Sequence, residues 1–91
     1  MALTVSREFE IANRLGLHAR AAAQLVHLAN RYASEIRICK DGVEVNGKSI
    51  MGVLMLAAPR ESRILVRADG PDAEQAVTAI GDLIAAKFGE E

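Results

Sequence analysis

Four short segments of the chain alternate apolar and polar residues, and this period of two predicts β-strands with one buried and one solvated face. They cover residues 3–11, 35–40, 43–45 and 62–68. In the first segment, Arg7 is the one break in the apolar series. In the fourth, Ile64, Val66 and Ala68 share the apolar face. A sheet built from such strands is buried on one side only.

The dipeptide Asp41-Gly42 separates the second and third segments. Asp-Gly between two alternating segments is a strong signal for a β-hairpin with a two-residue loop. Such a loop places Ile38 opposite Val45, so both apolar sets lie on one face. Cys39 falls on the opposite face, and without a partner thiol or a histidine motif we expect it to be inert.

Three other segments repeat their apolar residues with helical spacing. The first helix begins within residues 13–21 and ends near Ala33-Ser34. Its apolar stripe comprises Ala21, Ala22, Leu25, Val26, Leu28, Ala29, Tyr32 and Ala33. The last helix starts with Pro71 at its first helical position, followed by Asp72, and ends at Gly89. Its apolar stripe comprises Ala73, Ala76, Val77, Ile80, Leu83, Ile84 and Phe88.

Ser49 can cap a short helix from about Ile50 to Ala57, and Pro59 would end it. The residues of this helix that can face a core are Ile50, Val53, Leu54 and Ala57. Met51 and Met55 cannot both join them on so short a helix, so we expect exposed apolar surface there. Methionine often fills gaps in a core, whereas an exposed patch of Met and Leu indicates a docking surface.

The resulting order is β-α-β-β-α-β-α, which predicts an α+β fold formed by residues 1–91 as one domain. Short strands with one solvated face and three amphipathic helices fit a mostly antiparallel four-stranded sheet with the helices packed on one face. The first helix is a crossover between the first two strands, and it leaves room for another strand between them.

Apolar residues make up 51% of the chain and aromatic residues only 3%, so we expect a core of Ala, Val, Leu and Ile. A net charge of −1 and three aromatic residues provide neither a basic stripe nor a stacking platform, which argues against nucleic-acid binding. The single cysteine excludes an internal disulfide. Because the chain lacks both a membrane-length apolar segment and a signal-peptide pattern, we expect a cytoplasmic protein without membrane insertion. We also expect a monomer.

His18 lies at the junction between the first strand and the first helix, after the turn formers Asn13 and Gly16. The first turn of a helix has backbone N–H groups without intrahelical partners, and together with the guanidinium of Arg20 they favour an anion. A nucleophilic imidazole beside an anion site can accept a phosphoryl group, hold it and pass it on. The alternative is an ordinary surface histidine, since helix starts without a ligand are common.

His27 is half a turn out of phase with His18 on a helix, so the two cannot share a metal ion. We interpret His27 as a surface residue. The chain offers no metal-ligand cluster, no general base and no substrate pocket, and we expect neither a metal nor another cofactor. These absences suit a protein that is a substrate of other enzymes rather than an enzyme.

The segment Gly16-Leu-His-Ala-Arg20 resembles the active-site signature of HPr, the histidine-containing phosphocarrier family of the bacterial phosphotransferase system. The segment Asn46-Gly-Lys-Ser-Ile-Met-Gly-Val53 is similar to the regulatory serine segment of the same family. Two motifs at compatible spacing, together with the element order, cover essentially the whole chain. The resemblance implies an HPr-like open-faced β-sandwich.

The resemblance also implies the chemistry and the partners. His18 would be phosphorylated on Nδ1 by phospho-enzyme I, which draws on phosphoenolpyruvate, and would pass the group to a histidine or cysteine of a sugar-specific Enzyme II component. Arg20 would stabilise the phosphate, and Ser49 would be a regulatory phosphorylation site for an HPr serine kinase/phosphorylase. The residues expected to dock partners are Leu17, Ala23, Ile50, Met51 and Leu54.

One residue departs from the family's signature, because Ala21 stands where proline is common. Alanine has the best helix propensity, so we expect little damage to the helix start. The substitution leaves open whether the chain serves sugar uptake or is a paralogue in a nitrogen-related branch. Another alternative is a purely regulatory paralogue that docks on a kinase or transcription factor through its Met51/Leu54 surface.

Overall fold

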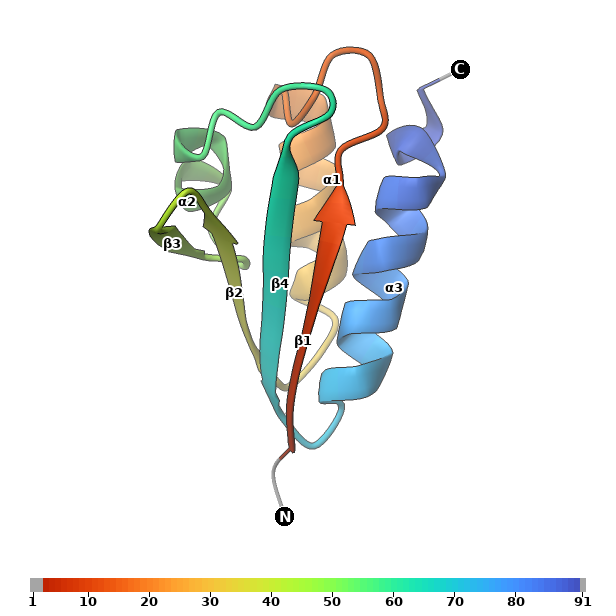
Figure 1. Ribbon diagram of the computed structural model, residues 1–91. Coiled ribbons are helices and arrows are strands. Elements are labelled where there is room, and N and C mark those ends of the chain that lie inside the picture. The colour runs from red at the N-terminus through yellow and green to blue at the C-terminus, as the bar shows by residue number, and fades with distance from the viewer. Residues whose placement is uncertain (1–2, 91) are drawn as a thin grey trace.

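The computed structural model describes residues 3–90 and contains a four-stranded sheet in the order β1-β4-β2-β3. The elements are β1 Leu3–Glu10, α1 Ala19–Ala29, β2 Glu35–Lys40, β3 Val43–Asn46, α2 Ile50–Met55, β4 Arg63–Gly70, α3 Ala73–Ala85 and the 3-10 helix η1 Lys87–Gly89. Every pair of neighbouring strands is antiparallel. Figure 1 shows the α-helices on one face of the sheet, which confirms the predicted open-faced arrangement of four strands and three helices.

The sheet topology follows from the two connections that the sequence identifies. β4 lies between β1 and β2, so the crossover through α1 does leave room for one strand. In the hairpin between β2 and β3, Ile38 lies opposite Val45, as predicted. Asp41 and Gly42 have φ angles of 51° and 82° in its loop. Consecutive positive φ angles are required in a type I′ turn, and Asp-Gly adopts them at low cost.

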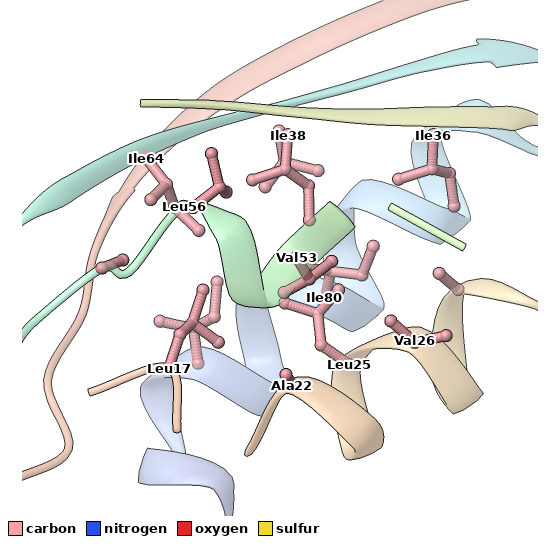
Figure 2. Packing of buried hydrophobic residues seen from close by; sticks show 14 of the residues in the cluster. Leu17, Ala22, Leu25, Val26, Ile36, Ile38, Val53, Leu56, Ile64 and Ile80 are labelled. Atoms are coloured by element: carbon pink, nitrogen blue, oxygen red, sulfur yellow. The ribbon is translucent and has the colours of Figure 1, made fainter. Parts of the chain in front are cut away.

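The core lies between the sheet and the helices and is almost entirely aliphatic. Figure 2 shows Ile38 of β2 pointing toward Val53 of α2 and Ile80 of α3, with Leu25 of α1 beside them. Phe88 is the one aromatic residue among the buried apolar side chains of residues 3–90. Each fully buried Val, Leu or Ile side chain contributes about 1.5–3 kcal/mol to folding. The fold is therefore stabilised by aliphatic burial, as the composition predicted.

The edge strand β1 contacts α3 through two residues of different character. Arg7, the break in the apolar series, donates to Thr78 Oγ1 at 3.4 Å and pairs with Glu74 at 3.8 Å. Its side chain therefore extends along α3 and does not enter the core. Phe9 packs so closely on Gly81 that a Cβ at this glycine would lie 2.5 Å from the ring. The absence of a side chain at Gly81 lets α3 approach the strand.

The first helix is shorter than predicted, since it ends at Ala29 and not near Ala33-Ser34. Asn30, the C-cap residue, donates to the carbonyl of Val26 twice, from its backbone N–H at 3.0 Å and from Nδ2 at 2.9 Å. Beyond the helix, Ala33 is exposed and Ser34 is buried. The apolar spacing continued past the true end of α1, which is why the sequence predicted a longer helix.

The second helix ends two residues earlier than predicted, because Ala57 has a left-handed φ angle of 48°. In the predicted core set, Val53 is buried, Leu54 is half-buried, and Ile50 and Ala57 are exposed. Leu56, just beyond the helix, is buried in its place. A helix of six residues offers only a narrow face to the core, so the other apolar residues remain at the surface.

The third helix begins at Ala73, with Asp72 as its N-cap residue and Pro71 outside it, so the prediction of Pro71 as the first helical residue was wrong. The carboxylate of Asp72 makes no capping hydrogen bond to α3. It accepts from the N–H groups of Ala33 and Ser34, both at 2.9 Å, and from Ser34 Oγ at 2.6 Å. These bonds tie the start of α3 to the loop between α1 and β2.

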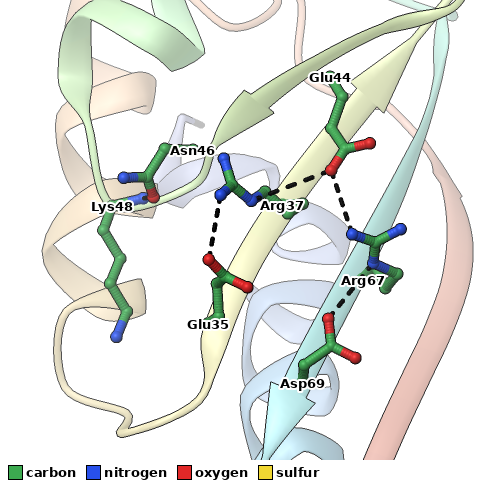
Figure 3. Close-up of polar contacts among 7 residues, drawn as sticks. All are labelled: Glu35, Arg37, Glu44, Asn46, Lys48, Arg67 and Asp69. Atoms are coloured by element: carbon green, nitrogen blue, oxygen red, sulfur yellow. Dashed lines mark hydrogen bonds and ion pairs between the residues drawn. The ribbon is translucent and has the colours of Figure 1, made fainter.

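The open face of the sheet carries a network of charged side chains (Figure 3). Arg37 pairs with Glu35 at 3.0 Å and with Glu44 at 3.9 Å. Arg67 pairs with Glu44 at 3.1 Å and with Asp69 at 3.4 Å. Exposed ion pairs contribute about 0–1 kcal/mol each. The network therefore keeps this face polar without contributing much to stability.

Candidate functional site

The loop between β1 and α1 is closed by its own hydrogen bonds. The buried side chain of Asn13 donates from Nδ2 to the carbonyl of Gly16 at 2.7 Å, and Gly16 N donates back to the carbonyl of Asn13 at 3.2 Å. Gly16 has a φ angle of 67°, in the region that favours glycine. The turn predicted from these two residues is present, and it turns the chain into the start of α1.

The same loop is packed against the segment that follows α2. Leu17 N donates to the carbonyl of Ala58 at 2.8 Å, and a Cβ at Gly16 would lie only 2.5 Å from that carbonyl oxygen. Gly16 is thus required both for its backbone conformation and for this close approach. The loop has little freedom, so the position of the residue that follows is well defined.

His18 is the N-cap residue of α1, which confirms the prediction that it lies at the helix start. Its backbone is extended, with φ −74° and ψ 178°, and its carbonyl accepts the first helical hydrogen bond from Ala22 N at 2.8 Å. The imidazole makes no capping hydrogen bond, the first turn carries no acidic residue, and the side chain is 30% exposed. The positive end of the helix therefore remains open to an anion.

Arg20 is exposed in the first turn of α1. Within residues 3–90 its guanidinium has no hydrogen-bond acceptor and no carboxylate within ion-pair distance. It lines two hollows of the surface, one next to His18 and one between α1 and α2. Its donors are consequently available to an anion that arrives at His18.

The hollow next to His18 has a volume of about 110 Å³. Its lining residues are Leu15, His18, Arg20, Gln24, Phe88, Gly89 and Glu90. Glu90 Oε2 lies 3.8 Å from His18 Nε2, and Glu90 Oε1 accepts from Leu15 N at 3.4 Å. The sequence analysis missed Glu90, because a residue beyond the last helix has no periodic pattern that could place it here.

A larger groove of about 620 Å³ runs between α1 and α2. The residues that line this groove are Arg20, Ala23, Gln24, Val26, His27, Asn30 and Ile50. Met51 and Met55 are 73% and 74% exposed, which confirms the predicted apolar surface on α2. His27 is exposed, as predicted, but it lies in this groove.

The predicted docking residues are not all available for docking. Ile50 and Met51 are exposed, Ala23 and Leu54 are half-buried, and Leu17 is only 4% exposed. Leu17 belongs to the core cluster because the loop turns its side chain inward, so its inclusion among the docking residues was wrong. We use the name docking surface for Ala23, Ile50, Met51 and Leu54.

Ser49 caps α2 as predicted, because its Oγ accepts from Gly52 N at 3.1 Å. The turn before it is fixed at two points. Lys48 N donates to Asn46 Oδ1 at 2.9 Å, and Lys48 Nζ donates to the carbonyl of Tyr32 at 2.7 Å. Unlike His18, Ser49 has a defined structural role in the start of its helix.

Residues 3–90 contain no group of three or more His, Cys, Asp or Glu side chains that could hold a metal ion. In the same part of the chain, no helix combines the length and the apolar character needed to cross a bilayer. Cys39 is free and half-buried.

Comparisons with known proteins agree with this geometry. Residues 5–86 match the protein family described as "PTS HPr component phosphorylation site". The phosphocarrier protein HPr of Cupriavidus necator is 46% identical over 86 residues, which cover 94% of this chain and 97% of the relative. HPr of Neisseria meningitidis is 44% identical over 86 residues with the same coverage. The crystal structure of HPr-C-His from Thermoanaerobacter tengcongensis matches with a TM-score of 0.92 at 44% identity, covering 96% of this chain and 98% of that chain.

Proposed function

This chain belongs to the HPr family of phosphocarrier proteins, and from this premise we propose that His18 accepts a phosphoryl group from phospho-enzyme I and passes it to an Enzyme II component. The observation that carries the proposal is the open start of α1, where a partly exposed imidazole is the N-cap residue and no acidic residue occupies the first turn. A phosphocarrier is a substrate of other proteins and not a catalyst.

In the proposed transfer, the phosphoryl group moves from the donor group of phospho-enzyme I to Nδ1 of His18. The lone pair of His18 Nδ1 attacks phosphorus, and the bond between phosphorus and the donor group of phospho-enzyme I breaks, with its electron pair staying on the donor. Nδ1 suits this role because the other ring nitrogen, Nε2, faces Glu90. The free N–H groups at the start of α1 and the guanidinium of Arg20 can then stabilise the phosphoryl oxygens.

A carrier must also release the group. The side chain of His18 is 30% exposed and Arg20 is at the surface, so the phosphoryl group would remain accessible to the next acceptor. A fully buried phosphate with several short hydrogen bonds would be held too tightly for onward transfer. The partial exposure of the site therefore supports a carrier rather than a protein that sequesters phosphate.

We assign partner binding to the docking surface. Arg20 and Gln24 line both the His18 hollow and the groove between α1 and α2, so the reacting side chain and the apolar surface are continuous. Met51 and Ile50 provide exposed apolar area at the edge of this groove. Apolar residues at the centre of an interface, with an arginine at its edge, suit a contact that forms and dissociates during each transfer.

We further propose Ser49 as the regulatory phosphorylation site, with an HPr serine kinase/phosphorylase as the enzyme. Ser49 precedes Ile50 and Met51 directly, so a phosphate on it would stand at the rim of the docking surface. A phosphoserine carries about −1.5 to −2 charges at neutral pH. Such a charge would weaken the binding of enzyme I without changing the imidazole.

We place the protein in the cytoplasm, as a monomer that serves sugar uptake. The departure from the family's signature at Ala21 does not distinguish this branch from a nitrogen-related one, because Ala21 is completely buried in the first turn of α1. A purely regulatory paralogue would dock without carrying phosphate. Labelling of His18 in the experiment below would decide against that alternative.

The decisive experiment is incubation of the protein with phosphoenolpyruvate and enzyme I, with and without each component. We expect one phosphoryl group per chain, labile in acid and stable in base, and located at His18 by mass spectrometry or phosphorus NMR. His27→Ala is the matched control, since His27 is exposed on the same helix and should be dispensable. Label that survives acid, or that disappears in the His27 variant, would contradict the proposal.

A further inference from the structure

Two reciprocal hydrogen bonds join the residues at the end of α1 to the turn that precedes α2. Asn30 Nδ2 donates to the carbonyl of Lys48 at 3.2 Å, and Lys48 Nζ donates to the carbonyl of Tyr32 at 2.7 Å. We call these two contacts the Asn30–Lys48 bridge. Asn30 is fixed on its own side by the carbonyl of Val26, which accepts its N–H at 3.0 Å. Lys48 is fixed by Asn46 Oδ1, which accepts its N–H at 2.9 Å (Figure 3).

The helix α2 has few buried side chains that attach it to the core. Of its six residues only Val53 is buried, whereas α1 has five buried residues among its eleven. A segment with few buried apolar contacts is more mobile, so a short helix of this kind depends on polar contacts at its ends for a fixed position. The Asn30–Lys48 bridge provides such contacts directly before Ser49, the cap of α2.

The bridge lies at one end of the groove between α1 and α2. Asn30 lines this groove, and so does Ile50, which follows Lys48 by two residues. Arg20 lines the groove as well, but it lies in the first turn of α1, at the opposite end of that helix. A change in the bridge would therefore move the exposed apolar residues of α2 relative to the arginine beside His18.

We propose that Asn30 and Lys48 are positioning residues of the docking surface, which hold Ile50 and Met51 where enzyme I binds them. The proposal rests on the transfer from phospho-enzyme I proposed above, and it identifies what keeps the docking surface in one arrangement before the partner arrives. A surface that is already ordered loses less conformational entropy on binding, so its affinity for the partner is higher. The bond from Lys48 Nζ is short and charge-assisted, which makes it the stronger of the two contacts.

Methyl NMR of the free protein tests the position of α2 without any transfer reaction. Lys48→Met keeps an unbranched side chain and removes the donor. Asn30→Ala removes the other contact without a change in charge. Each substitution should shift the methyl resonances of Met51 and Leu54, which lie further along α2. The methyl resonances of Ile64, in β4, should stay unchanged as the internal reference.

Transfer kinetics measure the consequence for docking. Lys48→Met and Asn30→Ala should each raise the Michaelis constant of enzyme I for this protein roughly three- to tenfold, the range expected from the net contribution of one hydrogen bond. The turnover number should stay unchanged, because neither side chain contacts His18. Lys48→Arg keeps a donor and should restore most of the affinity.

Lys40→Met is the matched control for the loss of a lysine. Lys40 is also half-buried and its ammonium also donates, at 3.0 Å, but to Asp41 in the hairpin. This variant should leave both the Michaelis constant and the methyl resonances of α2 unchanged.

Two results would overturn the proposal. One is an unchanged methyl spectrum in Lys48→Met and Asn30→Ala, and a raised Michaelis constant beside it would mean that these side chains contact enzyme I directly. The other is a shifted spectrum with an unchanged Michaelis constant, which would make the bridge a purely structural contact. If the wild type accepts no phosphate at all, the proposed function fails, whereas the methyl spectra still show whether the bridge positions α2.

Discussion

The two ends of the molecule each bring a carboxylate to the start of a helix, but with different geometry (Figure 1). At the His18 end, Glu90 lies 3.8 Å from the imidazole and accepts a backbone hydrogen bond of 3.4 Å. At the Asp72 end, the carboxylate accepts three hydrogen bonds of 2.6–2.9 Å from Ala33 and Ser34. The contacts at the first end are long, and those at the second are short.

This difference separates the roles of the two ends. A site that accepts and releases an anion must keep hydrogen-bond donors free. At the His18 end, the imidazole makes no capping hydrogen bond and the side chain of Arg20 is exposed. At an end that only stabilises the fold, every carboxylate oxygen can accept hydrogen bonds from the protein itself. Ser34 is 1% exposed and donates to Asp72 from both its backbone and its hydroxyl group. We therefore expect substitutions at the two ends to affect different measurements.

The largest effect is expected from His18→Ala. This variant should accept no phosphoryl group from enzyme I, because the nucleophile is removed. Its thermal midpoint should stay close to that of the wild type, since the imidazole makes no capping hydrogen bond and is partly exposed. Labelling with phosphoenolpyruvate and a thermal denaturation curve test both halves. Residual label would show that His18 is not the phosphorylated residue. A strongly destabilised variant would show that the His18 end also stabilises the fold.

Arg20→Ala should reduce transfer to and from His18 by about 10- to 100-fold, the loss expected when a charge-assisted hydrogen bond to an anion is removed. Its thermal midpoint should move little, because the guanidinium has no partner within residues 3–90. Arg31→Ala, an exposed arginine just beyond α1, is the control for the loss of one positive charge. Unchanged transfer together with a large loss of stability would make Arg20 a structural residue.

Asp72→Asn should show the opposite behaviour, with normal phosphorylation and a thermal midpoint lower by roughly 5 °C or more. The hydrogen bond from the Ser34 hydroxyl, followed by that from Ala33 N, lowers the pKa of Asp72 below its ordinary value of 3.8, while burial opposes the shift. Because the folded pKa is depressed, this stabilisation is present above the unfolded pKa and is lost as the pH falls through the folded value.

Denaturation between pH 2 and 6 measures this dependence. The wild type should lose stability on acidification below about pH 4, and part of that slope should disappear in Asp72→Asn. Asp82→Asn, at an exposed position of α3, is the charge-matched control and should retain the full slope. Equal slopes in all three proteins would show that Asp72 does not tie α3 to the preceding loop.

The sequence was sufficient for elements whose signal is local. The hairpin register depended only on Asp41-Gly42 and alternation, and the structure has Ile38 opposite Val45. The cap of α2 depended only on Ser49 and the helical residues after it, and it is present. In the same way, the turn formers Asn13 and Gly16 placed His18 at a helix start. These features are decided by neighbouring residues.

Features that depend on distant parts of the chain were not predictable. Asp72 has the composition of a helix cap, but its carboxylate bonds to a loop 38 and 39 residues away in sequence. Glu90 reaches His18 because Phe88 is buried and the turn before it is left-handed. Leu17 lies within a recognisable motif, yet its burial depends on the packing of the loop against Ala58. Tertiary contacts decided all three outcomes, and none of them leaves a periodic signal.

The smallest effects are expected at Ser49, a helix start that has a structural cap and is also proposed to receive a phosphate. Removal of the cap in Ser49→Ala should cost roughly 1 kcal/mol, because Gly52 N loses its acceptor. Ser49→Asp should retain this stability, since a carboxylate can also cap and favours a helix N-terminus. Both variants should keep the circular dichroism spectrum of the wild type.

The two variants should differ in their binding of enzyme I. The substitution Ser49→Asp adds a negative charge beside Ile50 and Met51. Desolvation and repulsion at the docking surface should then raise the Michaelis constant of enzyme I for this protein severalfold. Ser49→Ala should leave that constant unchanged, because it adds no charge. Its lower stability and normal transfer would separate the structural role of Ser49 from the regulatory one. If Ser49→Asp is phosphorylated at His18 as readily as the wild type, Ser49 is a helix cap alone.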